Sequence, residues 1–108
     1  MVATISAQAL ADLRRRGESL TLIDVRTPAE YGEVHVDCAR NMPLDRLDPQ
    51  SVVAEHGGRN APIYFVCRSG GRSGQAISKL KAAGFTKVYH LQGGFQAWTS
   101  ARKPVVRK

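Results

Sequence analysis

The sequence predicts a single α/β domain with a parallel sheet of about five strands and helices on both faces. Short apolar runs typical of buried strands alternate along the chain with helical patterns, and strands joined by helices pair in parallel through right-handed crossovers. The 108 residues contain no internal repeat or linker and are enough to bury one core. We therefore predict one domain over residues 1–108, with a basic C-terminal tail at about 102–108.

The first third of the chain carries clear helix-start signals. A short strand is predicted over 3–6 and a helix over 7–16, because Ser6 is a good N-cap residue. A buried strand follows at 20–25. After it, Thr27-Pro28-Ala29-Glu30 fits a capping box, with proline at the first helical position, where its missing N–H costs nothing.

The rest of the chain repeats this alternation. The predicted elements are a helical turn region over 49–56, a strand over 63–66, a helix from about 72 to 83, a strand over 87–91 and a helix over 95–100. Gly84 is placed to end the long helix, and Gly93-Gly94 is placed to make a tight turn before the last one.

The most informative stretch is IYFVCRSGGRS at residues 63–73, which indicates a nucleophile in an anion cradle. A buried strand brings Cys67 to the carboxyl edge of the sheet, where the crevices of open α/β folds lie. The glycines allow successive backbone N–H groups to point to one centre, and the helix that follows adds the positive end of its dipole. Since these donors favour a thiolate over a thiol, we predict that Cys67 is substantially ionised at neutral pH.

Cys67 and Arg72 form a C-x4-R loop that, with Arg68, Gly70 and Ser73, resembles the active-site loop of the rhodanese (thiosulfate sulfurtransferase) family. Two further segments are similar to other motifs of that family: LIDVRTPAEY at 22–31 and LQGGFQAW at 91–98. In that family the cysteine carries a persulfide. Phosphatases and arsenate reductases that share the fold have a loop one residue longer, C-x5-R, and position 73 here is serine. A phosphatase or arsenate reductase is therefore disfavoured.

The resemblance implies a role for each residue of the loop. Cys67 would be the catalytic nucleophile. The amides and side chains that would bind substrate are those of Arg68, Ser69, Gly70, Gly71, Arg72 and Ser73. The resemblance implies structural roles for Asp24, whose carboxylate would bond loop donors, and for Arg26, an ion-pair partner near Glu30 or Glu33.

The middle of the chain departs from the family's usual Gly-His-Ile-x-Gly-Ala run. Val34 and Cys38 stand where the family has glycines, and a Cβ at either position could shift this connection. Comparison with the family places a short strand after it, at 39–42. We expect Cys38 to be an inert small thiol that does not resolve a persulfide on Cys67.

Charge is distributed unevenly along the chain, whose formal net charge is +7. All nine acidic residues lie between Asp12 and Glu55, whereas residues 56–108 contain ten Lys or Arg. A basic field around Cys67 would gather small anionic sulfur donors or the acidic face of a partner protein. For the tail and the outer helix positions an ordinary solvated surface is favoured. Nucleic acid binding lacks an accompanying aromatic-rich strand or recognition helix.

These observations predict a sulfurtransferase that moves sulfane sulfur from an anionic donor such as thiosulfate to cyanide or a thiol through a Cys67 persulfide. The alternative is a persulfide carrier or binding module in a protein sulfur relay. No metal or organic cofactor is expected, because the two cysteines lack metal-ligand spacing and an ionised thiolate needs no general base. Neither a secretory signal nor a membrane span is recognised, so cytoplasm is expected.

Overall fold

The computed structural model describes residues 4–16, 21–56, 62–68 and 71–107. Its elements are β1 (Thr4–Ile5), α1 (Ala7–Arg15), β2 (Leu22–Asp24), α2 (Pro28–Glu33), β3 (Val34–Val36), β4 (Arg40–Asn41), the 3-10 turn η1 (Leu44–Arg46), α3 (Pro49–His56), β5 (Ile63–Val66), α4 (Gly71–Ala82), β6 (Val88–Leu91), α5 (Gly94–Ser100) and β7 (Val105–Arg107). The predicted fold class is confirmed.

The main sheet has five strands in the order β1-β6-β5-β2-β4, and all of its neighbouring pairs are parallel. Strand β5 lies in the centre, paired with β2 on one side and β6 on the other. The register aligns Asp24 of β2 with Val66 of β5. Asp24 is therefore level with the residue that precedes Cys67, at the carboxyl edge of the sheet.

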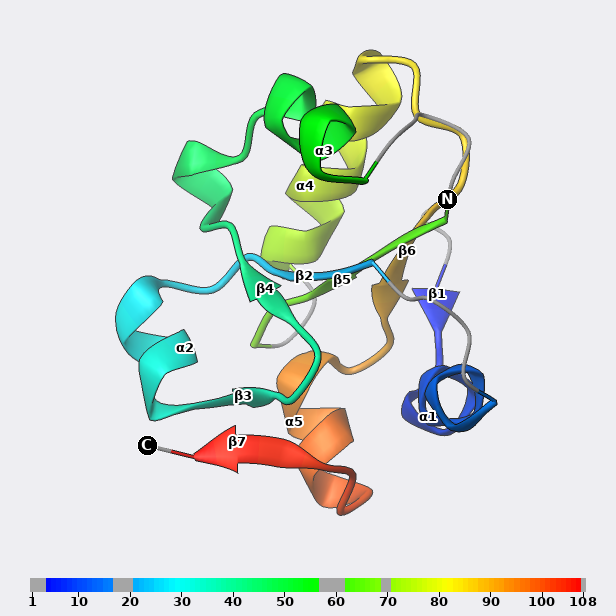
Figure 1. Ribbon diagram of the computed structural model, residues 1–108, viewed down its shortest axis with the longest axis vertical. Coiled ribbons are helices and arrows are strands. Elements are labelled where there is room, and N and C mark those ends of the chain that lie inside the picture. Colours follow the sequence, from blue (N-terminus) through cyan, green and yellow to red (C-terminus); the bar gives the residue numbers. More distant parts are fainter. Residues whose placement is uncertain (1–3, 17–20, 57–61, 69–70, 108) are drawn as a thin grey trace.

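Helices cover both faces of this sheet (Figure 1). Helices α3 and α4 lie on one face, where Val52, Ala76, Ile77 and Leu80 pack in a cluster that also contains Cys67. Helices α1 and α5 lie on the other face, over a second cluster. Its buried helical members are Ala7, Leu10, Phe95 and Trp98.

Two predicted helix caps are present. The Ser6 hydroxyl accepts a hydrogen bond of 3.1 Å from the amide of Ala9 at the start of α1. At the start of α2, Thr27 and Glu30 exchange the reciprocal bonds of a capping box, and Pro28 occupies the first turn. These local signals succeed because a cap needs only residues within one turn of the helix.

The C-terminal segment differs from the predicted tail, because residues 105–107 form β7. This strand pairs antiparallel with β3, which the sequence did not predict either. Val105 packs against the α1 and α5 cluster, and the indole N–H of Trp98 donates a 2.8 Å hydrogen bond to the Pro104 carbonyl. Apolar burial and this bond thus hold a segment for which the sequence analysis considered only the charges.

The substituted family glycines fit the observed backbone. Val34 has a φ of −161°, which is extended backbone that any residue adopts, and it begins β3. Cys38 packs, partly buried, against the α1 and α5 cluster. The two cysteines therefore pack on opposite faces of the sheet, since Cys67 belongs to the α3 and α4 cluster.

Candidate functional site

Cys67 follows β5 directly, at the edge where the sequence predicts it. Its side chain is 1 % exposed and packs among the apolar residues between the sheet and α4. Burial by itself favours the neutral thiol, because a charged group loses its hydration. A reactive thiolate at this position therefore needs compensating donors close by.

Helix α4 begins at Gly71, four positions after Cys67 and one before the predicted start. The first-turn amides of a helix have no partner within the helix and carry the positive end of its dipole. Ser73, in this first turn, is 1 % exposed, and its Oγ has no hydrogen-bond partner among the described residues. Arg68 is exposed, while Ser69 and Gly70 lie outside the described residues.

The Gly93-Gly94 turn packs directly against the Cys67 peptide, a contact that the sequence analysis missed. The amide of Phe95 donates a 2.7 Å hydrogen bond to the Cys67 carbonyl. Gly94 has a φ of +65°, and a Cβ there would lie 2.6 Å from the carbonyl oxygens of both Cys67 and Arg68. The sequence signal is the glycine pair itself, which predicts a turn but not the backbone that the turn approaches.

A buried ion pair lies beside this contact. Asp24 is fully buried and Arg26 is 4 % exposed, and the Arg26 Nη2 lies 2.7 Å from an Asp24 carboxylate oxygen. Arg26 also donates from Nη2 to the Val34 carbonyl at 2.7 Å. Its guanidinium carbon lies 4.2 Å from the centre of the Phe95 ring, a cation–π contact.

This pair corrects the predicted partner of Arg26, which was Glu30 or Glu33. Asp24 stands two residues before Arg26 and accepts bonds from its backbone amide and from its guanidinium. Glu30 instead completes the capping box of α2. A charged side chain this deeply buried pairs with the carboxylate buried beside it rather than with one on an exposed helix.

Polar contacts from β4 complete the edge. The side-chain amide of Asn41 donates to the carbonyls of Asp24 and Arg26, both at 3.0 Å. The Met42 amide donates to the Asp24 carbonyl at 3.0 Å. The backbone around the ion pair is therefore held from the side of β4, whereas α5 contacts the Arg26 guanidinium through the Phe95 ring.

A hollow of about 410 Å³ opens beside this edge. Its lining comes from the segment after β2, the segment around η1 and the second turn of α4, and comprises Val25, Thr27, Pro43, Leu44, Asp45 and Gln75. Among the described residues, no group of three or more His, Cys, Asp or Glu is arranged to hold a metal ion.

Known proteins resemble the whole chain. The rhodanese-like domain family matches residues 6–101. This chain is a member of the rhodanese-like domain family. A sulfurtransferase of Allochromatium vinosum is 35 % identical over 98 % of the chain and 96 % of that protein. In structure, the rhodanese-like domain of an Anabaena protein has a TM-score of 0.86 at 28 % identity, covering 100 % of this chain and 81 % of that one.

Several relatives of this rhodanese-like domain are longer proteins. An uncharacterized protein of Synechocystis is 38 % identical over 96 % of the chain, which spans 56 % of that relative. A probable adenylyltransferase/sulfurtransferase of Mycobacterium tuberculosis is also 38 % identical, over 94 % of the chain, which spans only 26 % of that protein. No helix in the described part of the rhodanese-like domain has the length and apolar character of a membrane span.

Replacing Gly94 with alanine is expected to disturb both the fold and the Cys67 peptide. The new Cβ would meet two carbonyl oxygens at 2.6 Å, and its φ of +65° costs a residue with a Cβ about 1–2 kcal/mol before any clash. Urea denaturation should show a loss of more than about 2 kcal/mol in the free energy of unfolding. Gly74→Ala is the control, because a Cβ at Gly74 meets nothing within 4 Å. Equal stability of the two variants would contradict the close approach.

Removing Arg26 should destabilise the domain strongly, because it leaves the Asp24 carboxylate buried without its partner. Arg26→Ala is expected to lower the free energy of unfolding by about 3–5 kcal/mol. The double variant Asp24→Asn with Arg26→Met should recover part of this loss, since it buries no unpaired charge. Arg15→Ala, which removes an exposed pair with Asp12, should cost less than about 1 kcal/mol. A loss at Arg26 no larger than at Arg15 would disprove the structural role of the buried pair.

Proposed function

We propose that this rhodanese-like domain transfers sulfane sulfur through a persulfide on Cys67. The observation that carries the proposal is the position of Cys67: it directly follows the central strand, the Phe95 amide bonds its carbonyl at 2.7 Å, and α4 begins four residues later. A fixed backbone close in sequence to the start of a helix is suited to stabilising an anionic sulfur. Sulfur transfer is also the activity named for several of the relatives, including the Allochromatium vinosum sulfurtransferase.

The reaction proceeds in two displacement steps. The Cys67 thiolate attacks the outer sulfur of thiosulfate, an S–S bond to Cys67 forms, and the bond to sulfite breaks as sulfite leaves with its electron pair. Cyanide or a thiolate then attacks the outer sulfur of the persulfide and releases the Cys67 thiolate. Neither step needs a general base or an external oxidant, since an ionised nucleophile and a stable leaving anion suffice.

The loop favours sulfur over a larger anion. A C-x4-R loop is one residue shorter than the C-x5-R loop of phosphatases and arsenate reductases of this fold, so it suits the single outer sulfur of a persulfide. The backbone amides of residues 69–73 would hold that sulfur, and Arg68 and Arg72 would contact the donor. The neighbouring hollow beside Val25 and Gln75 would admit the rest of the donor or the acceptor.

A second function is favoured by the comparisons: a sulfur carrier that passes its persulfide to partner proteins. The chain is 34 % identical to a putative sulfur carrier protein of Bacillus subtilis over 88 % of its length, and it spans 50 % of that protein. A carrier would form the same Cys67 persulfide but would turn over thiosulfate slowly. A donor panel of thiosulfate, glutathione persulfide and mercaptopyruvate, with turnover measured for each, separates the two.

Cys67→Ser should abolish sulfur loading. After incubation with thiosulfate and removal of the excess, intact mass should show one added sulfur atom on the wild type, which cyanide releases as thiocyanate. Cys38→Ser is the matched control and should load normally, because burial raises the pKa of the Cys38 thiol and keeps it neutral. Sulfur retained by Cys67→Ser, or lost in Cys38→Ser, would disprove the assignment.

Arg68 should contribute mainly to the binding of charged donors. Arg68 is exposed, and loss of a charge-assisted bond to thiosulfate should cost about 1.5–3 kcal/mol, or roughly ten- to a hundredfold in kcat/KM. We expect a smaller effect of Arg68→Ala, and of Arg72→Ala, on an uncharged persulfide donor. Lys81→Ala, on the exposed side of α4, is the control variant. Unchanged thiosulfate kinetics in both loop variants would favour the carrier function.

A further inference from the structure

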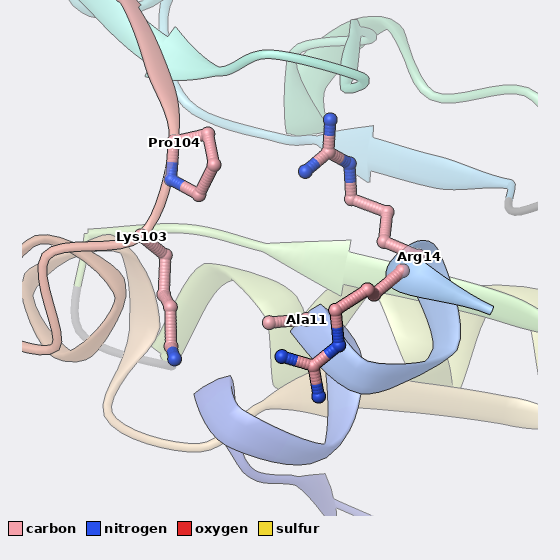
Figure 2. Close-up of a pocket in the computed structure, with 5 residues that line it drawn as sticks. Ala11, Arg14, Lys103 and Pro104 are labelled. Carbon is pink, nitrogen blue, oxygen red and sulfur yellow. The ribbon is translucent and has the colours of Figure 1, made fainter. Parts of the chain in front are cut away.

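A second basic site lies between α1 and the segment that leads into β7. Figure 2 shows Arg14, Lys103 and Pro104 around Ala11, and Arg15 completes the lining. These five residues line a hollow of about 470 Å³, which we call the α1 hollow. Its cations come from two segments almost the whole chain apart in sequence.

Each cation of the α1 hollow is oriented by a polar side chain of the same chain. Arg14 bonds the Asp37 carboxylate at 2.5 Å, and Arg15 bonds the Asp12 carboxylate. Lys103 donates a 2.8 Å hydrogen bond to the side-chain oxygen of Gln8, which links the segment before β7 to α1. An arginine has five N–H donors and a lysine has three, so these bonds orient the cations and leave donors for a further anion.

The α1 hollow is separate from the Cys67 edge. Ala11, one of its lining residues, packs against the cluster beneath α1 and α5, whereas Cys67 packs in the cluster beneath α3 and α4. Cys67, Arg68 and Ser73, the residues of the C-x4-R region whose side chains the structure describes, do not line it. A molecule bound there would leave the approach to Cys67 open.

We propose that the α1 hollow anchors an acidic segment of a partner protein. Arg14 and Arg15 already bind aspartate carboxylates within the chain, so carboxylates are the anions that their geometry suits. The small apolar surface of Ala11 and Pro104 would cover an aliphatic side chain between two acidic ones. The net charge of +7 on the chain would attract such a segment before contact.

Anchoring at this place would raise the local concentration of a partner without using the sulfur site. A partner tethered at the α1 hollow could present its own sulfur donor or acceptor group to Cys67, and the second contact would then be intramolecular. The anchor site itself does not depend on sulfur transfer. It can be tested, and can fail, while the Cys67 chemistry stands.

The test uses the full chain and a fluorescein-labelled probe peptide of sequence Asp-Glu-Leu-Glu-Asp, with Asn-Gln-Leu-Gln-Asn as its neutral counterpart. Fluorescence anisotropy should detect binding of the acidic peptide but not of the neutral one. The affinity should fall between about 50 and 200 mM salt, because salt screens exposed charges. Amide chemical-shift changes in the NMR spectrum should centre on residues 11–16 and 102–105.

The double variant Arg15→Gln with Lys103→Gln should weaken peptide binding about five- to tenfold. The control double variant, Lys79→Gln with Lys81→Gln, removes the same charge from exposed positions of α4. It should change the affinity for the peptide less than about twofold. Thiosulfate turnover should be the same in both double variants. Equal weakening in the two variants would mean diffuse attraction to a basic protein and would overturn the proposal.

Three further results would also overturn it. The first is shift changes confined to the Cys67 loop. The second is inorganic phosphate binding at the α1 hollow as tightly as the peptide, which would make it a small-anion site. The third is a single-stranded RNA oligonucleotide that displaces the peptide and binds more tightly, which would assign the α1 hollow to nucleic acid.

Discussion

The close approach of Gly94 to the Cys67 peptide is the constraint on which the rest of this edge depends. A bond of 2.7 Å from Phe95 fixes the Cys67 carbonyl, and the absence of a Cβ at Gly94 allows the two backbones to meet. This contact ties α5, which lies late in the chain, to the end of the central strand. In the proposed reaction, a nucleophile whose peptide is held in this way would need little reorganisation.

The buried pair of Asp24 and Arg26 extends that constraint across the edge. Through the Val34 carbonyl and the ring of Phe95, Arg26 joins β2, β3 and α5 around one guanidinium. A buried ion pair contributes little net stability compared with a well-packed apolar pair, because desolvation offsets its attraction. The pair instead fixes the positions of these segments relative to one another, because the Arg26 guanidinium has all of its partners only when β2, β3 and α5 have packed together.

Part of the positive charge of the chain lies in two places, for which we propose different purposes. Around Cys67, we propose that the amides at the start of α4 and Arg68 bind a small anion. Around α1, cations held by Asp12, Asp37 and Gln8 suit an anion presented by another protein. The net charge of the chain does not distinguish the surroundings of Cys67 from the α1 hollow, because it carries no information on where the cations lie.

The sequence by itself determined the fold class, the helix caps, the position of Cys67 and the main-sheet strands other than β4, because these follow from local patterns. Alternating apolar runs, the Thr27 capping box and the glycines after Cys67 act within a few residues. Only the tertiary structure decided the partner of Arg26, the contact of Gly94 with Cys67, the pairing of β7 with β3 and the α1 hollow. In each case several partners are available in the sequence. Burial and distance select among them, and both are defined only once the chain has packed.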